Sequence, residues 1–311
     1  MAQHQGIGLS LNADLIDGDM PTLERHLGLV ADAGAEWVEL ILHGLDVVVA
    51  GRLHPARMAA VTRILDRFEL GRTLHLPYDL NLLSPRRAEG SRDVFAAGLS
   101  FAAETGVRAV TYHSSFLELS PEARASEFYG RFGPDGDERY ERLIEYDREV
   151  LASLAAEAPT GTVVGVENTA WNDPAKRRGY GADARDVVEH VTAVGATNLG
   201  ITLDLGHLHM RSTATGRDLA DEVRAVLPHV VHIHAHDNFG DSTPTERYMD
   251  ALPFGFGDLH LPVGWGTIPW DRILPDLAHY RGVWTMEIEF RLYPHFADIV
   301  REMRERFLAV G

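Results

Sequence analysis

The sequence contains no cysteine and a single lysine, Lys176, among its 311 residues. Without cysteine there is no disulfide framework, thiolate nucleophile, iron–sulfur cluster or cysteine-ligated zinc, so any bound metal must use histidine, aspartate or glutamate. A Schiff-base mechanism would depend on Lys176 alone, and this residue lies in a polar, loop-like stretch that offers no desolvating pocket. We therefore set aside both thiol and amine nucleophiles.

Basic residues are also scarce. The chain has 29 Lys and Arg against 46 Asp and Glu, a formal net charge of −17. Such a chain repels polyanions, so nucleic acid is not an expected partner. No apolar run approaches bilayer-spanning length, and the first residues lack a basic segment followed by an apolar one. With 45% hydrophobic residues, the composition predicts a soluble, cytoplasmic globular protein with a large core and no membrane partner.

Short apolar or β-branched runs alternate with segments of helical periodicity along the whole chain. The predicted strands are Gly6–Leu11, Trp37–Leu42, Arg72–Leu76, Ala109–His113, Thr162–Glu167, Gly200–Leu205, Val230–Ala235 and Val283–Ile288. The predicted helices are Pro21–Ala33, Pro55–Phe68, Ser91–Thr105, Glu138–Ala156, Asp183–Val194, Asp218–Val226, Trp270–Tyr280 and Pro294–Leu308.

One helix follows each of the eight predicted strands, which is the pattern of repeated βαβ units and a parallel sheet. Eight such units in a chain of this length predict a closed α/β barrel of the (β/α)8 or TIM type, formed by residues 1–311 as a single domain. A doubly wound open sheet is the alternative, but no Gly-x-Gly-x-x-Gly turn follows the first strand.

Ionisable side chains gather where six consecutive predicted strands end. They are His75, His113, Glu167, Asp204 with the following His207, His234 with His236, and Glu287 with Glu289. Strand residues alternate between faces, so these groups share the inward face of the barrel. Buried charges at one rim are costly unless they share a ligand, and a divalent cation would supply one.

Each residue alone also has a structural interpretation. A single histidine at a strand end, such as His75 or His113, is more often a hydrogen-bonded packing residue than a ligand. Asp204 before Gly206 could form a turn or cap a helix, and His232, one layer deeper than His234, is expected to be a hydrogen-bonded core residue. Glu39, His209 and Glu289 have no assigned task, and His4, His26, His54, His190, His279 and His295 are expected to be solvated.

The segment after the seventh predicted strand, Phe239–Pro269, is long and rich in glycine and proline, and we expect it to lie over the barrel mouth as a lid. It contains the aromatic residues Tyr248, Phe254, Phe256 and Trp265. Aromatic rings there suit the apolar faces of a sugar, although the same rings could simply pack the loop on the rim. Arg177 and Arg178, beside Lys176, could meet a substrate phosphate or carboxylate, but a solvated basic turn is the favoured interpretation.

Several short motifs in order along the chain carry a family resemblance. They are Leu74-His75-Leu76-Pro77, Tyr112-His113-Ser114, Val166-Glu167-Asn168-Thr169, Leu203-Asp204-Leu205-Gly206-His207, His234-Ala235-His236-Asp237-Asn238, Asp258-Leu259-His260 with Gly264-x-Gly266-x-Ile268, and Met286-Glu287. The set resembles the xylose-isomerase-like TIM-barrel superfamily. That superfamily includes sugar isomerases and epimerases as well as metal-dependent AP endonucleases of the endonuclease IV type.

The two branches imply different metal centres. The sugar-acting branch implies one divalent ion, usually Mn, Co or Mg, on Glu167, Asp204, His234 and Glu287. The endonuclease-like branch implies up to three Zn ions on a set that adds His75, His113, His207, Asp258 and His260. The sequence supplies all nine positions, so one to three ions of Mn, Co, Mg or Zn stay open.

The preferred function at this point is a metal-dependent isomerase or epimerase of a sugar, keto-sugar or polyol derivative. Proton transfer would pass through a metal-stabilised enediolate, with Glu167 and Glu287 as acid and base. Family members that transfer hydride use a catalytic lysine, and no lysine stands at a strand end here. The candidate substrate-binding residues are Trp171, Arg178, His236 and Trp265, and the expected partner is a small carbohydrate.

Two other functions stay open. A polynuclear zinc hydrolase or lyase, acting on a small phosphoester or glycoside, would use the same ligands to activate a water molecule. A metal-binding barrel without catalytic activity would not need carboxylates on both sides of the ion. Association into a homo-oligomer, through the helices or the lid, is compatible with the sequence.

Overall fold

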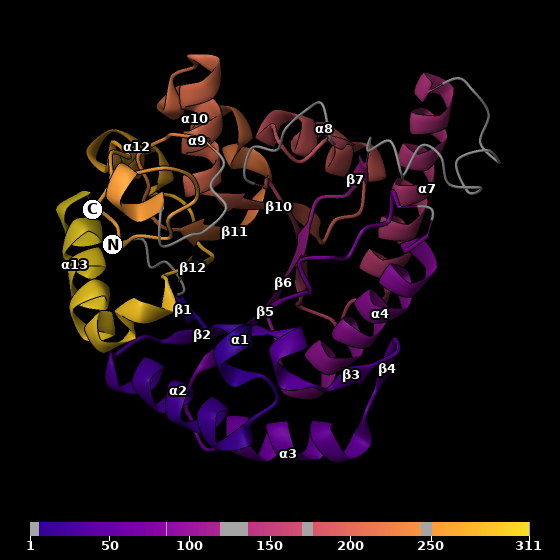
Figure 1. Ribbon diagram of the computed structural model, residues 1–311, viewed down its shortest axis with the longest axis horizontal. Helices are drawn as coiled ribbons and strands as arrows, with labels where there is room; N and C mark the ends of the chain where they lie inside the picture. The colour runs from indigo at the N-terminus through magenta and orange to yellow at the C-terminus, as the bar shows by residue number, and fades with distance from the viewer. Residues whose placement is uncertain (1–5, 85, 119–135, 170–176, 244–250, 311) are drawn as a thin grey trace.

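Eight parallel strands close into a barrel in the computed structural model, which describes residues 6–84, 86–118, 136–169, 177–243 and 251–310 (Figure 1). The order around the barrel is β1, β12, β11, β10, β8, β6, β5, β2. Their bounds are β1 Gly6–Ser10, β2 Trp37–Ile41, β5 Gly71–His75, β6 Ala109–His113, β8 Val163–Glu167, β10 Leu199–Asp204, β11 Val230–Ala235 and β12 Val283–Met286. The predicted TIM barrel is therefore confirmed, with each predicted strand within two residues of the observed one.

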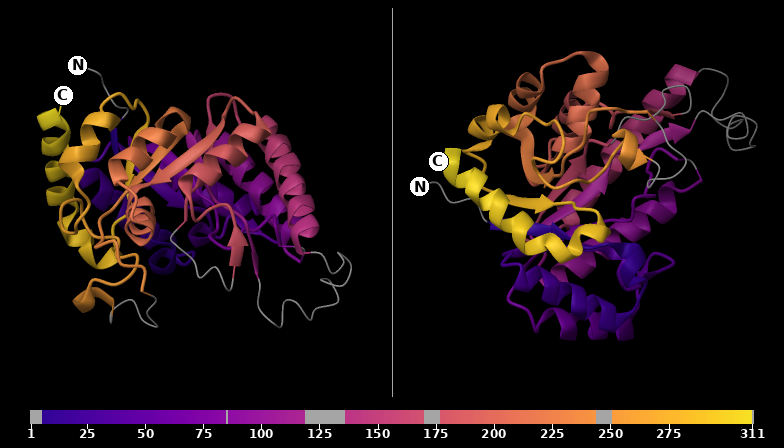
Figure 2. Two further views of the ribbon diagram at one scale, coloured as in Figure 1. Left: turned by 90° about the horizontal axis from the view of Figure 1, so that it is seen from above. Right: turned by 60° about the vertical axis from the view of Figure 1, so that its left-hand side comes forward.

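Helices surround the ring of strands, as two further views show (Figure 2). They are α1 Ala13–Ile16, α2 Met20–Asp32, α3 Pro55–Leu65, α4 Ala88–Thr105, α7 Gly136–Glu157, α8 Ala184–Val194, α9 Leu205–Thr215, α10 Leu219–Val226, α12 Trp270–Leu277 and α13 Phe296–Val310. Short 3₁₀ segments occupy Leu42–Leu45, Leu227–His229, Leu252–Phe254 and Phe290–His295. Two-stranded sheets pair β3 Val48–Val49 with β4 Arg52–Leu53, and β7 Phe116–Glu118 with β9 Arg177–Gly179.

Two of these helices, α1 and α9, were not predicted. The α9 segment contains Gly206, Ser212 and two threonines, which are weak helix formers. Its helix begins directly at the end of β10 because the Asp204 carboxylate accepts a hydrogen bond from the backbone N–H of His207 at 2.7 Å. The N-cap role considered for Asp204 is thus present, on a helix that was not predicted.

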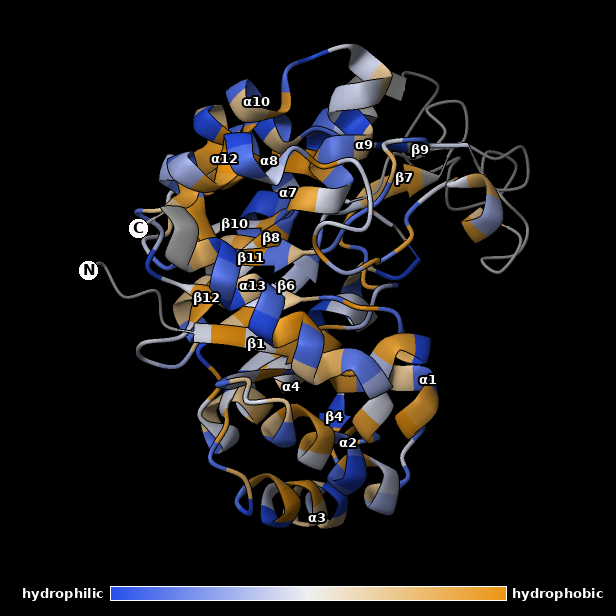
Figure 3. Cartoon of the chain, turned by 90° about the vertical axis from the view of Figure 1, so that its left-hand side faces the viewer, coloured by the Kyte–Doolittle hydropathy of each residue, from blue (hydrophilic) through white to orange (hydrophobic). Residues whose placement is uncertain are grey.

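The space between strands and helices holds the apolar core. Outward-facing strand residues such as Ile7, Leu74, Val110 and Ile233 are completely buried, and the helices place their apolar sides on them. Figure 3 shows hydrophobic and hydrophilic residues alternating along these helices, as expected for elements with one face on a core. Burial of this layer supplies the main stabilisation of the barrel.

The interior of the barrel is also polar one layer below its mouth. Thr111 on β6 lies 3.2 Å from Thr202 on β10, across the intervening β8, and both are completely buried. Glu39 on β2 and His232 on β11 occupy the same depth of the interior and are buried too. TIM barrels usually fill this space with valine, isoleucine and leucine, so the polar layer needs a reason beyond stability.

Two helix histidines expected to be solvated are buried, and that expectation was wrong. His190 on α8 lies 2.7 Å from Asp147 on α7, and its ring stacks on Tyr180 at 3.8 Å. His26 on α2 is buried against Tyr293. Both helices turn these positions toward the barrel, where a histidine can pack as an amphipathic ring. The Asp147–His190 pair links two neighbouring helices beneath the segment that follows β9.

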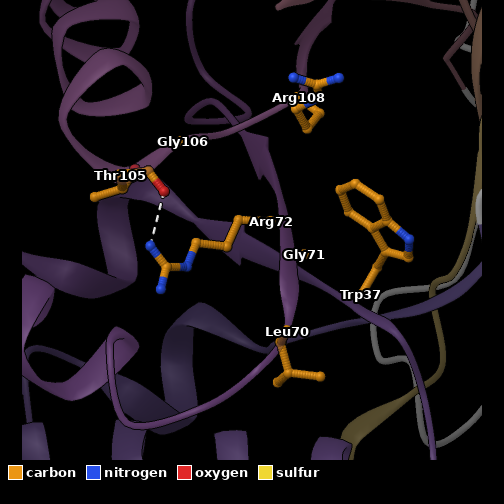
Figure 4. A pocket seen from close by; sticks show the side chains of 7 residues that line it. All are labelled: Trp37, Leu70, Gly71, Arg72, Thr105, Gly106 and Arg108. Carbon is orange, nitrogen blue, oxygen red and sulfur yellow. Dashed lines mark hydrogen bonds between the residues drawn. The ribbon is translucent and has the colours of Figure 1, made fainter.

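One pocket of the barrel lies where strands begin. Figure 4 shows it beside the starts of β2 and β5, lined by Trp37, Leu70, Gly71, Arg72, Thr105, Gly106 and Arg108. The Arg72 guanidinium donates a hydrogen bond to the carbonyl of Thr105 at 2.8 Å, so this positively charged group already has a partner within the protein. The pocket is at the opposite end of the strands from the ionisable residues. In TIM barrels that end usually contributes to stability and not to catalysis.

Among the described helices, none has the length and hydrophobicity needed to cross a bilayer.

Gly165→Ala tests the packing of the polar interior. An added Cβ would lie 2.0 Å from Thr202 Oγ1 and 3.0 Å from the backbone nitrogen of Thr202, so the barrel wall must shift. We expect a loss of about 1–3 kcal/mol in the free energy of unfolding, measured by urea denaturation. Gly90→Ala is the matched control, because its Cβ would meet nothing within 4 Å inside α4, and it should be neutral or slightly stabilising. Equal stabilities for the two variants would contradict the packing described.

Candidate metal centre

Four residues from four strands meet at the carboxyl end of the barrel. Glu167, Asp204, His234 and Glu287 each offer one ligand atom, and these atoms all lie within 4.8 Å of one another. The first three are completely buried, and Glu287 is nearly so. His234 Nδ1 lies 3.1 Å from Glu167 Oε1 and 3.4 Å from Glu287 Oε1. The structure thus brings together the four residues predicted to hold one divalent ion; their role as ligands stays a prediction.

His75 and His113 approach the same carboxylate from the neighbouring strands β5 and β6. The Nε2 atom of each lies 3.2 Å from Glu167 Oε2. Tyr78 covers both rings at the rim, with centroid distances of 4.9 Å to His75 and 5.3 Å to His113. Glu167 therefore faces His234 with one oxygen and this histidine pair with the other, which is the arrangement of a carboxylate able to bridge two cations.

A second group lies beside the first, at the start of α9 and in the loop after β11. It consists of His207, His236, Asp258 and His260, again with ligand atoms within 4.8 Å of one another. Asp258 Oδ2 lies 2.9 Å from His207 Nε2 and 3.0 Å from His260 Nε2. The Nε2 atom of His236 lies 3.1 Å from Asp204, so this ring lies between the two groups. The predicted contact of His236 with substrate stays a prediction.

Backbone carbonyls orient three of these histidines. Nδ1 of His75 lies 2.6 Å from the Leu76 carbonyl, and Nδ1 of His207 lies 2.8 Å from the Asn168 carbonyl. Nδ1 of His260 lies 3.1 Å from the Glu287 carbonyl. Since a carbonyl only accepts, Nδ1 must carry the proton in each ring. Nε2 is then the nitrogen turned toward the carboxylates, as in metal sites where an outer hydrogen bond fixes the histidine tautomer.

Asn168 holds the junction between β10 and α9. Its side-chain oxygen accepts from the Asp204 backbone N–H, and its side-chain nitrogen donates to the Asp204 carbonyl, both at 2.9 Å. Its own carbonyl is the acceptor for His207. Asn168 is buried directly after Glu167, so one residue aligns three candidate ligands on three elements.

Asp237 anchors the long loop that carries Asp258 and His260. Its carboxylate accepts from the Gly264 N–H at 2.8 Å and from the Trp270 indole N–H at 2.9 Å. The backbones of Asp237 and Leu261 exchange hydrogen bonds of 2.7 and 3.0 Å. At Gly266 a Cβ would lie 2.2 Å from the Asn238 carbonyl, which explains the glycine in this part of the motif. Residues 261–270 of the loop are therefore fixed against the segment that directly follows β11.

The electrostatics of the mouth are dominated by opposite charges in close contact. Burial by itself lowers the pKa of His207, but the carboxylates of Asp204 and Asp258 more than offset it and raise the pKa well above its usual value. The same balance of burial against Asp258 raises the pKa of His260 to about 10. For Glu167, burial is outweighed by His234 and His113, and its pKa lies well below the usual value. Acidic and imidazole groups neutralise one another here.

The chemistry of the donors fits divalent cations. Three carboxylates and one imidazole make a set of oxygen and nitrogen ligands that suits Mg, Mn, Co and Zn, and the histidine-rich second group favours Zn. The buried Asp258 Oδ1 and the His236 Nδ1 have no hydrogen-bond partner among the described residues. A cation would replace the protons that now hold the carboxylates and imidazoles together.

The remaining predicted site residues are spread more widely. Trp265 lies in the anchored part of the loop, between Gly264 and Ile268, and is 53% exposed. Phe254 is 70% exposed, so both rings face solvent. Arg178 lies on β9, and not in the basic turn that was favoured, with its guanidinium over the Tyr140 ring at 4.0 Å. Its contact with substrate stays a prediction. Trp171, Lys176 and Tyr248 lie outside the described residues.

Glu39 is the site residue that the sequence analysis left without a task. Its Oε1 lies 3.2 Å from His234 Nε2 and 3.4 Å from His232 Nε2. His232 was expected to be a hydrogen-bonded core residue, yet neither of its ring nitrogens has a hydrogen bond of good geometry among the described residues. The only early signal was a glutamate in the middle of an apolar strand, Trp-Val-Glu-Leu-Ile.

Asn168→Ala should disrupt the junction it holds. Loss of two buried hydrogen bonds to the Asp204 backbone leaves an N–H and a carbonyl unsatisfied, and we expect about 2–4 kcal/mol of destabilisation in urea unfolding. Divalent-metal affinity should fall as well, because Asp204 and His207 lose their alignment. Asn198→Ala, which removes one hydrogen bond to the Ala155 carbonyl near the start of β10, is the control; it should leave metal affinity intact. A stable Asn168→Ala protein with unchanged affinity would disprove this role.

Metal binding should release protons and weaken as the pH falls. Below a pKa of about 10 the His260 Nε2 is protonated, so a cation must displace that proton to bind there. Mass action predicts about a tenfold loss of apparent affinity per pH unit for each proton displaced. Competition with a chromophoric chelator at pH 6.5 and 7.5, with proton release measured in weak buffer, checks this expectation. Affinity that is independent of pH would contradict it.

Comparison with known proteins connects this geometry to a family. A sequence profile described as "Xylose isomerase-like TIM barrel" matches residues 27–308. An uncharacterized protein, MJ1311, of Methanocaldococcus jannaschii is 24% identical over 240 residues, which cover 76% of this chain and 70% of that protein.

Solved structures share the whole architecture. A D-tagatose 3-epimerase-like protein superposes with a TM-score of 0.69 at 21% identity, covering 98% of each chain. An L-ribulose 3-epimerase superposes with a TM-score of 0.66 at 17% identity, covering 99% of this chain and 95% of the other. At these identities the superpositions establish the fold.

Proposed function

This chain belongs to the family of xylose isomerase-like TIM barrels, and from that premise we propose that it is a divalent-metal-dependent epimerase or isomerase of a sugar or sugar derivative. One observation carries the proposal: Glu167, Asp204, His234 and Glu287 converge from four strands on one point. The two 3-epimerases among the similar structures support a ketose or keto-sugar as substrate. The proposal treats residues 1–311 as one catalytic domain.

Glu167 and Glu287 are the proposed acid and base. Glu167 is the last residue of β8 and Glu287 directly follows β12. These two strands are separated by β10 and β11, so the two carboxylates approach the site from different sides. One carboxylate would take the proton from the carbon next to the carbonyl, and the electron pair would move onto the carbonyl oxygen. The other would return a proton to the opposite face of the same carbon. The bound cation supplies Lewis acidity that lowers the cost of negative charge on the substrate oxygens.

Other residues would shape and dry the site in this proposal. Tyr78, packed over His75 and His113, forms one wall of the mouth. The exposed Trp265 and Phe254 rings are suited to stack on the apolar face of a sugar. His75 and His113 would donate hydrogen bonds to Glu167 and hold its carboxylate in place.

A polynuclear zinc hydrolase or lyase is the second candidate, and the group of His207, His236, Asp258 and His260 favours it. With His75 and His113 on the other oxygen of Glu167, the mouth offers enough nitrogen and oxygen donors for more than one cation. Such a centre would bind a small phosphoester or glycoside and activate water. The strongly acidic composition argues against DNA as the substrate.

Metal content and solvent exchange decide between the two functions. For the proposed epimerase, we expect divalent metal in the purified protein and incorporation of deuterium from D2O into a ketose such as tagatose, ribulose or psicose at the carbon beside the carbonyl. Glu167→Gln and Glu287→Gln should each lower exchange by at least about 10²-fold. Asp204→Asn keeps the helix cap and should lose metal, whereas His279→Ala, at an exposed position, should behave as the parent. Three zinc ions with phosphodiester or glycoside cleavage and no exchange would overturn the epimerase assignment.

A further inference from the structure

We propose that Glu39 is a positioning residue that fixes the orientation and tautomer of His234, so that Nδ1 of this ring faces the ligands Glu167 and Glu287. The inference rests on the proposed metal centre and concerns a residue one layer below it. Glu39 lies on β2 and His234 on β11, with β1 and β12 between them. Their contact therefore crosses the interior of the barrel.

The two ring nitrogens of His234 face different carboxylates. Nδ1 lies 3.1 Å from Glu167 Oε1 and 3.4 Å from Glu287 Oε1, at the mouth. Nε2 lies 3.2 Å from Glu39 Oε1, on the inner side. If Nε2 donates its proton to Glu39, Nδ1 presents a lone pair to the place where the candidate ligand atoms meet.

Glu39 is itself held in position. Its Oε1 accepts a hydrogen bond from Thr73 Oγ1 at 3.3 Å, on the neighbouring strand β5, and lies 3.4 Å from His232 Nε2. The side chain is completely buried, and its Oε2 has no hydrogen-bond partner among the described residues. A buried, half-satisfied carboxylate is costly, so stability does not explain this residue in a layer that aliphatic side chains usually fill.

His234 differs in this respect from other histidines of the mouth. His75, His207 and His260 are oriented by backbone carbonyls, which no substitution of the acceptor residue removes. For His234, the partner of the nitrogen that faces away from the candidate ligands is the Glu39 side chain. A carboxylate increases the basicity of the ring more than a carbonyl does. The structure therefore assigns to Glu39 the role that the backbone performs elsewhere, at the histidine most central to the site.

Three variants separate positioning from packing. Glu39→Leu removes the acceptor at similar volume, Glu39→Gln keeps an acceptor oxygen without the charge, and Thr285→Val is the control. Thr285 is a buried neighbour of His234 in the strand register, and its hydroxyl has no hydrogen-bond partner among the described residues. Affinity for Zn²⁺ or Co²⁺ is measured by chelator competition, together with the visible spectrum of bound Co²⁺ and urea unfolding.

We expect Glu39→Leu to bind metal about 10–100-fold more weakly, with an altered Co²⁺ spectrum. Glu39→Gln should restore most of the affinity, and Thr285→Val should bind as the parent. Equal affinity and spectrum for the parent and Glu39→Leu would overturn the role of Glu39 while leaving the metal centre standing. A parent protein that binds no divalent metal would instead overturn the proposed function, and this inference with it.

Histidine-labelled parent protein gives a test that does not depend on the folding of a variant. With Zn²⁺ bound, long-range ¹H–¹⁵N correlation should show His234 protonated at Nε2, with Nδ1 shifted by the metal. Metal on Nε2 and a proton on Nδ1 would overturn the inference directly.

Discussion

The burial of opposite charges in direct contact is the constraint on which the carboxyl end of this barrel depends. Glu167, Asp204, Asp258 and Glu287 each have an imidazole nitrogen within 3.5 Å. Glu167, Asp204 and His234 are completely buried, whereas the side chains of Asp258, His113 and His260 are 24–29% exposed. Any one of them alone would be expensive to desolvate. Together they form an arrangement that is satisfied when each carboxylate has a positive partner, whether a protonated ring or a cation.

The barrel makes this arrangement possible because its wall is rigid and its ligands are anchored from behind. Asn168 fastens the end of β10 to the end of β8, and Asp237 fastens the long loop to β11. Carbonyl groups set the tautomers of three rings. Side chains held in this way lose little further freedom when they bind a ligand, which is the structural meaning of preorganisation.

Much of the fold and part of the site could be predicted from the sequence. The strands are visible as short apolar runs, and polar residues at their ends point to one rim because parallel strands all finish there. The α9 helix was missed because its cap and tertiary contacts compensate for weak intrinsic propensity. His190 was misjudged because a polar ring in a helix can face another buried polar group, here Asp147, which lies 43 positions away in the chain.

By itself, the sequence determined the order of strands and helices and the absence of thiol chemistry. It also determined that the side chains of Glu167, Asp204 and His234 point into the barrel. These features follow from periodicity and composition, which are local properties. Only the tertiary structure decided which of these groups meet. Glu39 reaches His234 across 195 positions of sequence, and His236 joins Asp258 and His260 in a second group. Such contacts depend on closure of the barrel and on the path of one loop, and no local pattern records either.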